Sequence, residues 1–165
     1  MTDLPDLDRR AVEAGVAVVA RLRPDDLERP TPCTDWTLAE LLAHMTFQHV
    51  GFAAAAEGHG ADMDLWRVRP LGTYPVGTYR AAAERVTAAF GADGVLDRSF
   101  ALPEFGGGAE FPGRQAIGFH LVDYVAHGWD VACTLGVGIE FDADVLDAAL
   151  GFATAVPDGE VRLRP

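Results

Sequence analysis

The sequence predicts an all-α protein: an antiparallel four-helix bundle with a small hairpin or loop insertion before the fourth helix and an additional C-terminal helix. Three observations support this class. Apolar side chains recur every three or four residues in five segments, as they do along the buried face of a helix. Alternation typical of strands is confined to the segment around residues 95–113. The length of 165 residues suits one domain, which we place at residues 1–165.

Apolar spacing and one capping signal mark the first two helices. The first helix is predicted to end near Pro24, and its apolar or small positions are Leu7, Ala11, Ala14, Val18 and Leu22. The second is predicted to start at Thr37, because Thr37 and Glu40 form a T-x-x-E capping box, and to run to Gly58. Residues 59–73 are predicted to be a loop.

The remaining elements follow from spacing and from glycine and proline stops. The third helix closes at Gly91, with apolar positions at Tyr79, Ala83, Val86 and Phe90. A hairpin or ordered loop is expected around the three glycines at 106–108. The fourth helix is predicted from Pro112 to Leu135 with Gly136 as its stop, and the fifth from near Asp142 to before Pro157. The tail "EVRLRP" is compatible with a strand.

Composition excludes several classes of function. The formal charge of −12 argues against nucleic acid or an anionic membrane as partner. The start lacks a signal-peptide pattern and no apolar run could span a bilayer, so we expect a cytoplasmic protein with small-molecule partners. The lack of lysine, with Ser99 as the only serine, excludes Schiff-base lysine chemistry and a G-x-S-x-G nucleophile. Cys33 and Cys133 are predicted to be reduced thiols in the core, and a homodimer is left open.

Two otherwise apolar helices carry lines of polar residues. In the fourth predicted helix His120, Asp123, His127 and Asp130 fall within an arc of about 80° around the axis. In the second, Glu40, His44 and Gln48 repeat every four residues. Burying such groups without partners would cost several kcal/mol each, so the two lines are predicted to face each other around a cation.

The predicted ligands are His44, Asp123 and His127, two imidazoles and one carboxylate. Three protein ligands leave coordination positions open, as in catalytic sites, and the set suits Zn²⁺, with Ni²⁺, Fe²⁺ and Mn²⁺ left open. His120 and Asp130 are the catalytic candidates, in the second shell or in proton transfer. His49 and His59 are expected to be ordinary hydrogen-bonded or surface histidines, and Cys33 to be structural in its capping loop.

Two stretches, "PTPCTDWTLAELLAHM" and "DYVAHGWDVACTLG", resemble the actinobacterial branch of the DinB-like superfamily, the group similar to mycothiol-dependent maleylpyruvate isomerases. The resemblance covers the chain from the first helix to about residue 136. It implies a metal-binding four-helix bundle in which His44 matches the first ligand, His127 the last, and Asp123 a position where relatives have Glu, Asp or His. It also implies mycothiol or a similar thiol as cosubstrate.

Three functions follow as hypotheses. The first is a metal-dependent transferase or isomerase that activates a mycothiol-like thiol for reaction with a small electrophile. The second is a hydrolase that uses metal-bound water, for which His120 is the candidate general base. The third is a bundle that binds a metal or small ligand without catalysis.

Overall fold

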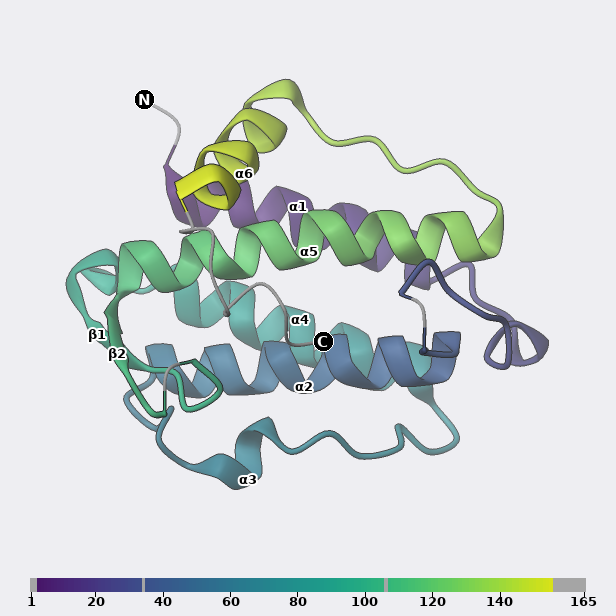
Figure 1. Cartoon of the computed structure of the whole chain (residues 1–165), viewed down its shortest axis with the longest axis horizontal. Helices are drawn as coiled ribbons and strands as arrows, with labels where there is room; N and C mark the ends of the chain where they lie inside the picture. The colour runs from purple at the N-terminus through teal and green to yellow at the C-terminus, as the bar shows by residue number, and fades with distance from the viewer. Residues whose placement is uncertain (1–2, 34, 106, 156–165) are drawn as a thin grey trace.

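The computed structural model describes residues 3–33, 35–105 and 107–155 (Figure 1). Within these residues the all-α prediction is confirmed, and the predicted tail "EVRLRP" lies outside them. The helices are α1 (Leu4–Val19), α2 (Leu38–Ala56), α3 (Met63–Trp66), α4 (Pro75–Phe90), α5 (Gly113–Leu135) and α6 (Ala143–Ala155). Two 3₁₀ turns, Pro24–Asp26 and Val95–Asp97, and the strands β1 (Ser99–Ala101) and β2 (Glu110–Pro112) complete the fold.

Four long helices form two packed layers, α1 with α5 and α2 with α4 (Figure 1). One core cluster joins the starts of α1 and α5, represented by Leu7 and Ile117, to the ends of α2 and α4, represented by Phe52 and Phe90. A second core cluster joins the ends of α1 and α5 to the starts of α2 and α4. The two helices within a layer therefore run parallel, and the two layers run antiparallel to each other. The long connection from α2 to α4 makes this possible, because it returns along the bundle before α4 begins (Figure 1).

The predicted capping box at the start of α2 is present. The Thr37 hydroxyl oxygen accepts from the Glu40 N–H at 3.3 Å, and the Glu40 carboxylate accepts from the Thr37 N–H at 2.8 Å. These two bonds satisfy free N–H groups at the helix start. They fix where α2 begins and therefore which of its residues face α5.

The expected loop at 59–73 contains one short helix, α3, and the all-loop expectation is wrong there. Trp66 of α3 is buried and its indole N–H donates to the carbonyl of Gly60 at 2.8 Å. The ring lies against Gly51 of α2, where an added Cβ would come within 2.3 Å of it. Because α2 is covered on this outer side as well, it is buried nearly all round and shows no single apolar stripe.

The predicted hairpin is confirmed as the antiparallel pair β1 and β2, with Phe100 opposite Phe111. Gly107 and Gly108 have positive φ in the connecting turn, a conformation that suits glycine. The hairpin leads directly into α5, which ends at Gly136 in the left-handed conformation, as predicted. None of the helices in the described part of the chain is both long and apolar enough to cross a membrane.

Candidate metal centre

Helices α2 and α5 bring three predicted ligands together. Nε2 of His44 on α2 lies 4.0 Å from Oδ2 of Asp123 on α5, and Nε2 of His127 lies 3.3 Å from Oδ1 of the same carboxylate. One ligand atom from each residue lies within 4.8 Å of the others. Asp123 and His127 are neighbours because they are four residues apart on one helix face.

Trp36, the residue before the capping box, covers the two imidazoles. Its ring centroid lies 4.7 Å from that of His44 and 6.4 Å from that of His127. The two imidazoles are 5.4 Å apart and nearly perpendicular. All three rings are partly buried. The indole therefore limits the access of water to one side of this group and restricts how the imidazoles rotate.

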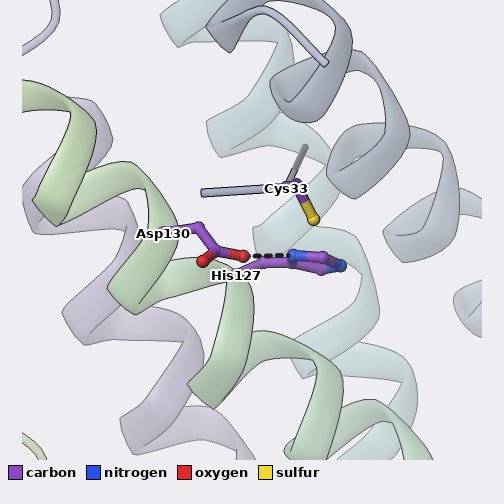
Figure 2. Close-up of side chains that lie close together, drawn as sticks. All are labelled: Cys33, His127 and Asp130. Atoms are coloured by element: carbon purple, nitrogen blue, oxygen red, sulfur yellow. Dashed lines mark hydrogen bonds and ion pairs between the residues drawn. The ribbon is translucent and has the colours of Figure 1, made fainter. Parts of the chain in front are cut away.

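His127 also belongs to a second group on its other ring nitrogen (Figure 2). Its Nδ1 lies 3.0 Å from Oδ2 of Asp130, and the Cys33 side chain points toward the same ring and carboxylate. Ligand atoms of Cys33, His127 and Asp130 lie within 4.8 Å of one another. A neutral His127 that donates from Nδ1 to Asp130 keeps the Nε2 lone pair toward Asp123 and His44.

Cys33 was expected to have a structural role in its capping loop, and its contact with α5 was not predicted. Cys33 and His127 are far apart in the sequence, and no spacing pattern links a loop residue to a helix. Both cysteines are free, as predicted, but neither is a core residue, since Cys33 is partly buried and Cys133 is exposed. Burial, together with the negative charge of Asp130, raises the pKa of the Cys33 thiol, so this group stays protonated at neutral pH.

The ionisable groups of the centre are shifted in different directions. Burial lowers the pKa of His44 and outweighs the attraction of Asp123. Burial also opposes charge on His127, but the carboxylates of Asp123 and Asp130 together raise its pKa to about 9. Burial would raise the pKa of Asp123, yet the hydrogen bond from His127 holds it below its usual value. Without a cation, an Asp123 carboxylate and a His127 imidazolium form an ion pair beside a neutral His44.

His120, predicted as a catalytic candidate, lies in a different part of the core. It is fully buried, with Nδ1 2.7 Å from Asp8 of α1 and Nε2 3.1 Å from Nδ1 of His49. No hydrogen bond or ion pair of the described residues joins it to the three predicted ligands. The angular prediction ignored height: His120 and His127 share a face, but seven residues separate them by about 10 Å along the axis.

The polar residues predicted to form one line on α2 also lie in different environments. Glu40 is used by the capping box, and the Gln48 amide donates to Glu104 at 2.7 Å. Only His44 of this line reaches the centre. His59 is exposed in its loop, and His49 is a buried, hydrogen-bonded core residue stacked on Tyr124, so both fit the ordinary roles expected for them.

A cleft of about 670 Å³ opens beside His44, between the first half of α2 and the segment before α4. Its lining is mainly apolar and includes Trp36, and its volume is typical of pockets for small molecules. The centre thus combines a converging donor set with an adjacent space for a ligand.

Comparison with known proteins places the chain in a family. Residues 9–132 match the family described as mycothiol maleylpyruvate isomerase N-terminal domain. The chain is also 31% identical over 159 residues to two uncharacterised proteins of Mycobacterium tuberculosis, Rv0738 of strain H37Rv and MT0763 of strain CDC 1551. The match covers 93% of this chain and 79% of each relative. On this evidence, the chain belongs to the family of the mycothiol maleylpyruvate isomerase N-terminal domain.

Proposed function

We propose that this chain is a metal-dependent enzyme that activates a low-molecular-weight thiol, such as mycothiol, for reaction with a small electrophile. The observation that carries the proposal is the convergence of His44, Asp123 and His127, with ligand atoms within 4.8 Å of one another. Two imidazoles and one carboxylate are the donor set of open, catalytic divalent sites. The set suits Zn²⁺ best and accepts Ni²⁺, Fe²⁺ or Mn²⁺. Family membership supports the thiol.

Each residue has a defined task in this proposal. His44, Asp123 and His127 hold the cation, and Asp130 fixes the tautomer and orientation of His127 through Nδ1. A bound divalent cation lowers the pKa of a thiol and so supplies thiolate at neutral pH. Trp36 shields the imidazoles from water on one side. The buried position of the carboxylates and imidazoles strengthens their electrostatic interaction with the cation.

The reaction needs no oxidant. In an addition to an electron-poor double bond, the thiol sulfur bonds to one carbon and a proton ends on the other, so atoms and electrons balance. Reversal after rotation about the resulting single bond gives cis/trans isomerisation, whereas retention gives a thioether conjugate. Both outcomes use the same residues of this chain.

The hydrolase hypothesis is less well supported by the arrangement of side chains. It requires a general base beside the cation, and the candidate for that task, His120, is fully buried with both ring nitrogens engaged by Asp8 and His49. The non-catalytic hypothesis uses the same ligands, so only experiment distinguishes it from the enzyme hypothesis.

Metal analysis and thiol titration test the proposal. Protein purified without chelator and without a His-tag is expected to hold about one divalent ion per chain at the three-ligand centre. After Co²⁺ substitution, addition of a low-molecular-weight thiol is expected to produce sulfur-to-metal charge-transfer absorption in the near ultraviolet. A spectrum that stays silent at saturating thiol, in protein with a full complement of cobalt, would contradict thiol activation and leave the hydrolase and binding-only hypotheses.

Matched variants connect these signals to the named residues. His127→Ala and His44→Ala are expected to lose the metal, whereas His59→Ala, in an exposed loop, retains it. Circular dichroism confirms that each variant is folded before its metal is measured. Full metal content in a folded His127→Ala protein would overturn the ligand set.

A further inference from the structure

The cleft beside His44 has two walls of different origin. One wall is the first half of α2 with the indole of Trp36. The other is the segment that connects α2 to α4 (residues 57–74, the crossover segment), which contributes Val68 and Leu71. His44 borders the cleft, whereas Asp123 and His127 do not line it. A molecule in the cleft therefore lies on the His44 side of the candidate metal centre, beside Trp36.

The walls favour an apolar occupant. Most of the lining is aliphatic or aromatic, and no element of the described residues covers Val68 on the outer wall, which is 48% exposed. An apolar group that displaces water from such a surface gains about 25 cal/mol for each Å² covered. A volume of about 670 Å³ exceeds what a short polar acid would fill.

Charged groups lie at different levels of the cleft. Glu40, toward the start of α2, has its carboxylate bound by the N–H and hydroxyl of Thr37. Arg69 lies over the ring of Phe47 at 5.8 Å, one turn beyond His44 along α2. His44 and Phe47 are neighbours on the helix surface, because they are three residues apart. Arg69 therefore lies one turn beyond His44, on the side of the cleft away from Glu40.

Arg69 has capacity for an anion. Its one hydrogen bond goes to the carbonyl of Asp64 at 3.3 Å, and no ion pair of the described residues includes it. A guanidinium has five N–H donors in a fork that matches a carboxylate. The neighbouring Arg67, by contrast, pairs with Asp64 at 2.9 Å and does not line the cleft. In a chain of net charge −12, an arginine without an acidic partner at the edge of an apolar cleft indicates an anionic ligand.

We propose that this cleft binds a small organic acid with an apolar body, whose carboxylate pairs with Arg69 and whose body lies between α2 and the crossover segment. That this acid is the electrophilic acceptor of the thiol rests on the proposed function; its binding to the cleft does not. The acceptor would then be an apolar acid, such as an unsaturated aliphatic or aryl acid, and not a short dicarboxylate.

Calorimetry with simple probes tests the binding. Octanoate, its neutral analogue octanamide and the short dicarboxylate maleate are titrated into the full chain, first stripped of metal and then reloaded with zinc. Octanoate is expected to bind about two- to fivefold more tightly than octanamide, the factor that an ion pair of about 0.5–1 kcal/mol at an exposed guanidinium supplies. Maleate is expected to bind more weakly than octanoate. Equal affinity of octanoate and octanamide would overturn the anionic end of the site.

Two variants and a control locate the probe. Arg69→Gln, at an exposed position, is expected to remove the preference for octanoate while octanamide binding stays within about twofold. Arg67→Gln is the matched control and leaves both affinities unchanged. Ala39→Trp, which fills the cleft from α2, is expected to abolish binding of both probes. Unchanged octanoate binding in Ala39→Trp would place the probe elsewhere and overturn the proposal.

The metal-free titration separates this proposal from the proposed function. Octanoate that binds only after zinc is restored would sit on the metal, and the Arg69 assignment would be wrong. Octanoate that binds metal-free protein, combined with a silent cobalt–thiol spectrum, would leave the cleft assignment in place and contradict the thiol chemistry alone. Sedimentation tests the rival occupant: a dimer that Val68→Glu dissociates and octanoate does not disturb would overturn a small-molecule site.

Discussion

Nδ1 of His127 lies 3.0 Å from Oδ2 of Asp130, one turn further along α5. A carboxylate in this position orients an imidazole, fixes its tautomer and raises its basicity. We therefore expect Asp130→Asn to lower the metal affinity by roughly 10–100-fold without loss of the fold. Competition with a chromophoric chelator measures this change. Asp147→Asn, at an exposed position on α6, is the control, and an Asp130→Asn protein with the affinity of that control would show that Asp130 has no part in the centre.

The pKa of His127 predicts a pH dependence of metal binding. In the metal-free protein the carboxylates around His127 raise its pKa to about 9, so the metal must displace a proton at neutral pH. His44 has a lowered pKa and is already neutral there. The apparent affinity is expected to rise by about tenfold per pH unit between pH 7 and 9, with release of about one proton. Calorimetry in buffers of different ionisation enthalpy counts that proton, and an affinity independent of pH across this range would contradict the shift.

The same shift has a consequence for folding of the metal-free protein. A histidine with a raised pKa in the folded state contributes stability that is complete below its unfolded pKa of about 6.5 and is lost as the pH rises through the folded value. We expect the thermal midpoint of metal-free protein to fall between pH 7 and 9.5. In Asp130→Asn, where one of the two carboxylates is neutral, this decrease is expected to be smaller. An equal decrease in wild type and variant would assign it to other groups.

The buried group around His120 predicts a loss of stability that does not affect the metal. If His120 donates from Nδ1 to Asp8, its Nε2 accepts from Nδ1 of His49, and Nε2 of His49 has no partner among the described residues. Removal of Asp8 would leave a second buried group unpaired. Asp8→Ala is therefore expected to lower the free energy of unfolding by about 1–3 kcal/mol.

Thermal unfolding and metal analysis of the same Asp8→Ala sample check this prediction. For a chain of this size the midpoint is expected to fall by roughly 2–4 °C for each kcal/mol, while metal content stays at the wild-type level. Glu84→Ala, exposed on α4, is the control for loss of an acidic residue. Loss of metal at unchanged stability would indicate that His120 belongs to the metal centre, as the sequence predicted.

The sequence was sufficient for features that depend on local periodicity. Several helix starts and stops followed from signals within a few residues, such as the Thr37–Glu40 box and Gly136. The predicted end of the first helix near Pro24 is wrong, because α1 ends at Val19 and Pro24 begins a separate 3₁₀ turn. The pairing of Asp123 with His127 followed because an i,i+4 pair fixes both direction and height along a helix. The addition of His44, on α2, followed from the prediction that the two polar lines face each other. The same reasoning did not give the position of His120, because a projection down the helix axis gives the direction of a side chain but not its height along the axis.

Features that depend on the crossover between α2 and α4 were beyond sequence reasoning. The parallel direction of α2 and α4, the covering of α2 by Trp66, and the cleft near Arg69 all follow from the path of residues 57–74. No periodicity in that segment specifies its path, because its contacts are made with residues distant in sequence. The approach of Cys33 to His127 is likewise a tertiary contact of a loop.

The packing of the crossover on α2 predicts opposite effects of two glycine substitutions. A Cβ at Gly51 would lie 2.3 Å from the Trp66 ring, which is buried and held by its bond to Gly60, so Gly51→Ala must displace it. We expect a loss of about 1–3 kcal/mol in the free energy of unfolding. At Gly77 of α4, no described atom beyond the adjoining helix backbone lies within 4 Å of the corresponding position, so Gly77→Ala is expected to gain roughly 0.5–1 kcal/mol from helix propensity. Because both changes add the same methyl group to a helix, denaturant unfolding of the pair isolates the contact, and a Gly51→Ala protein as stable as Gly77→Ala would show that Trp66 does not pack on α2.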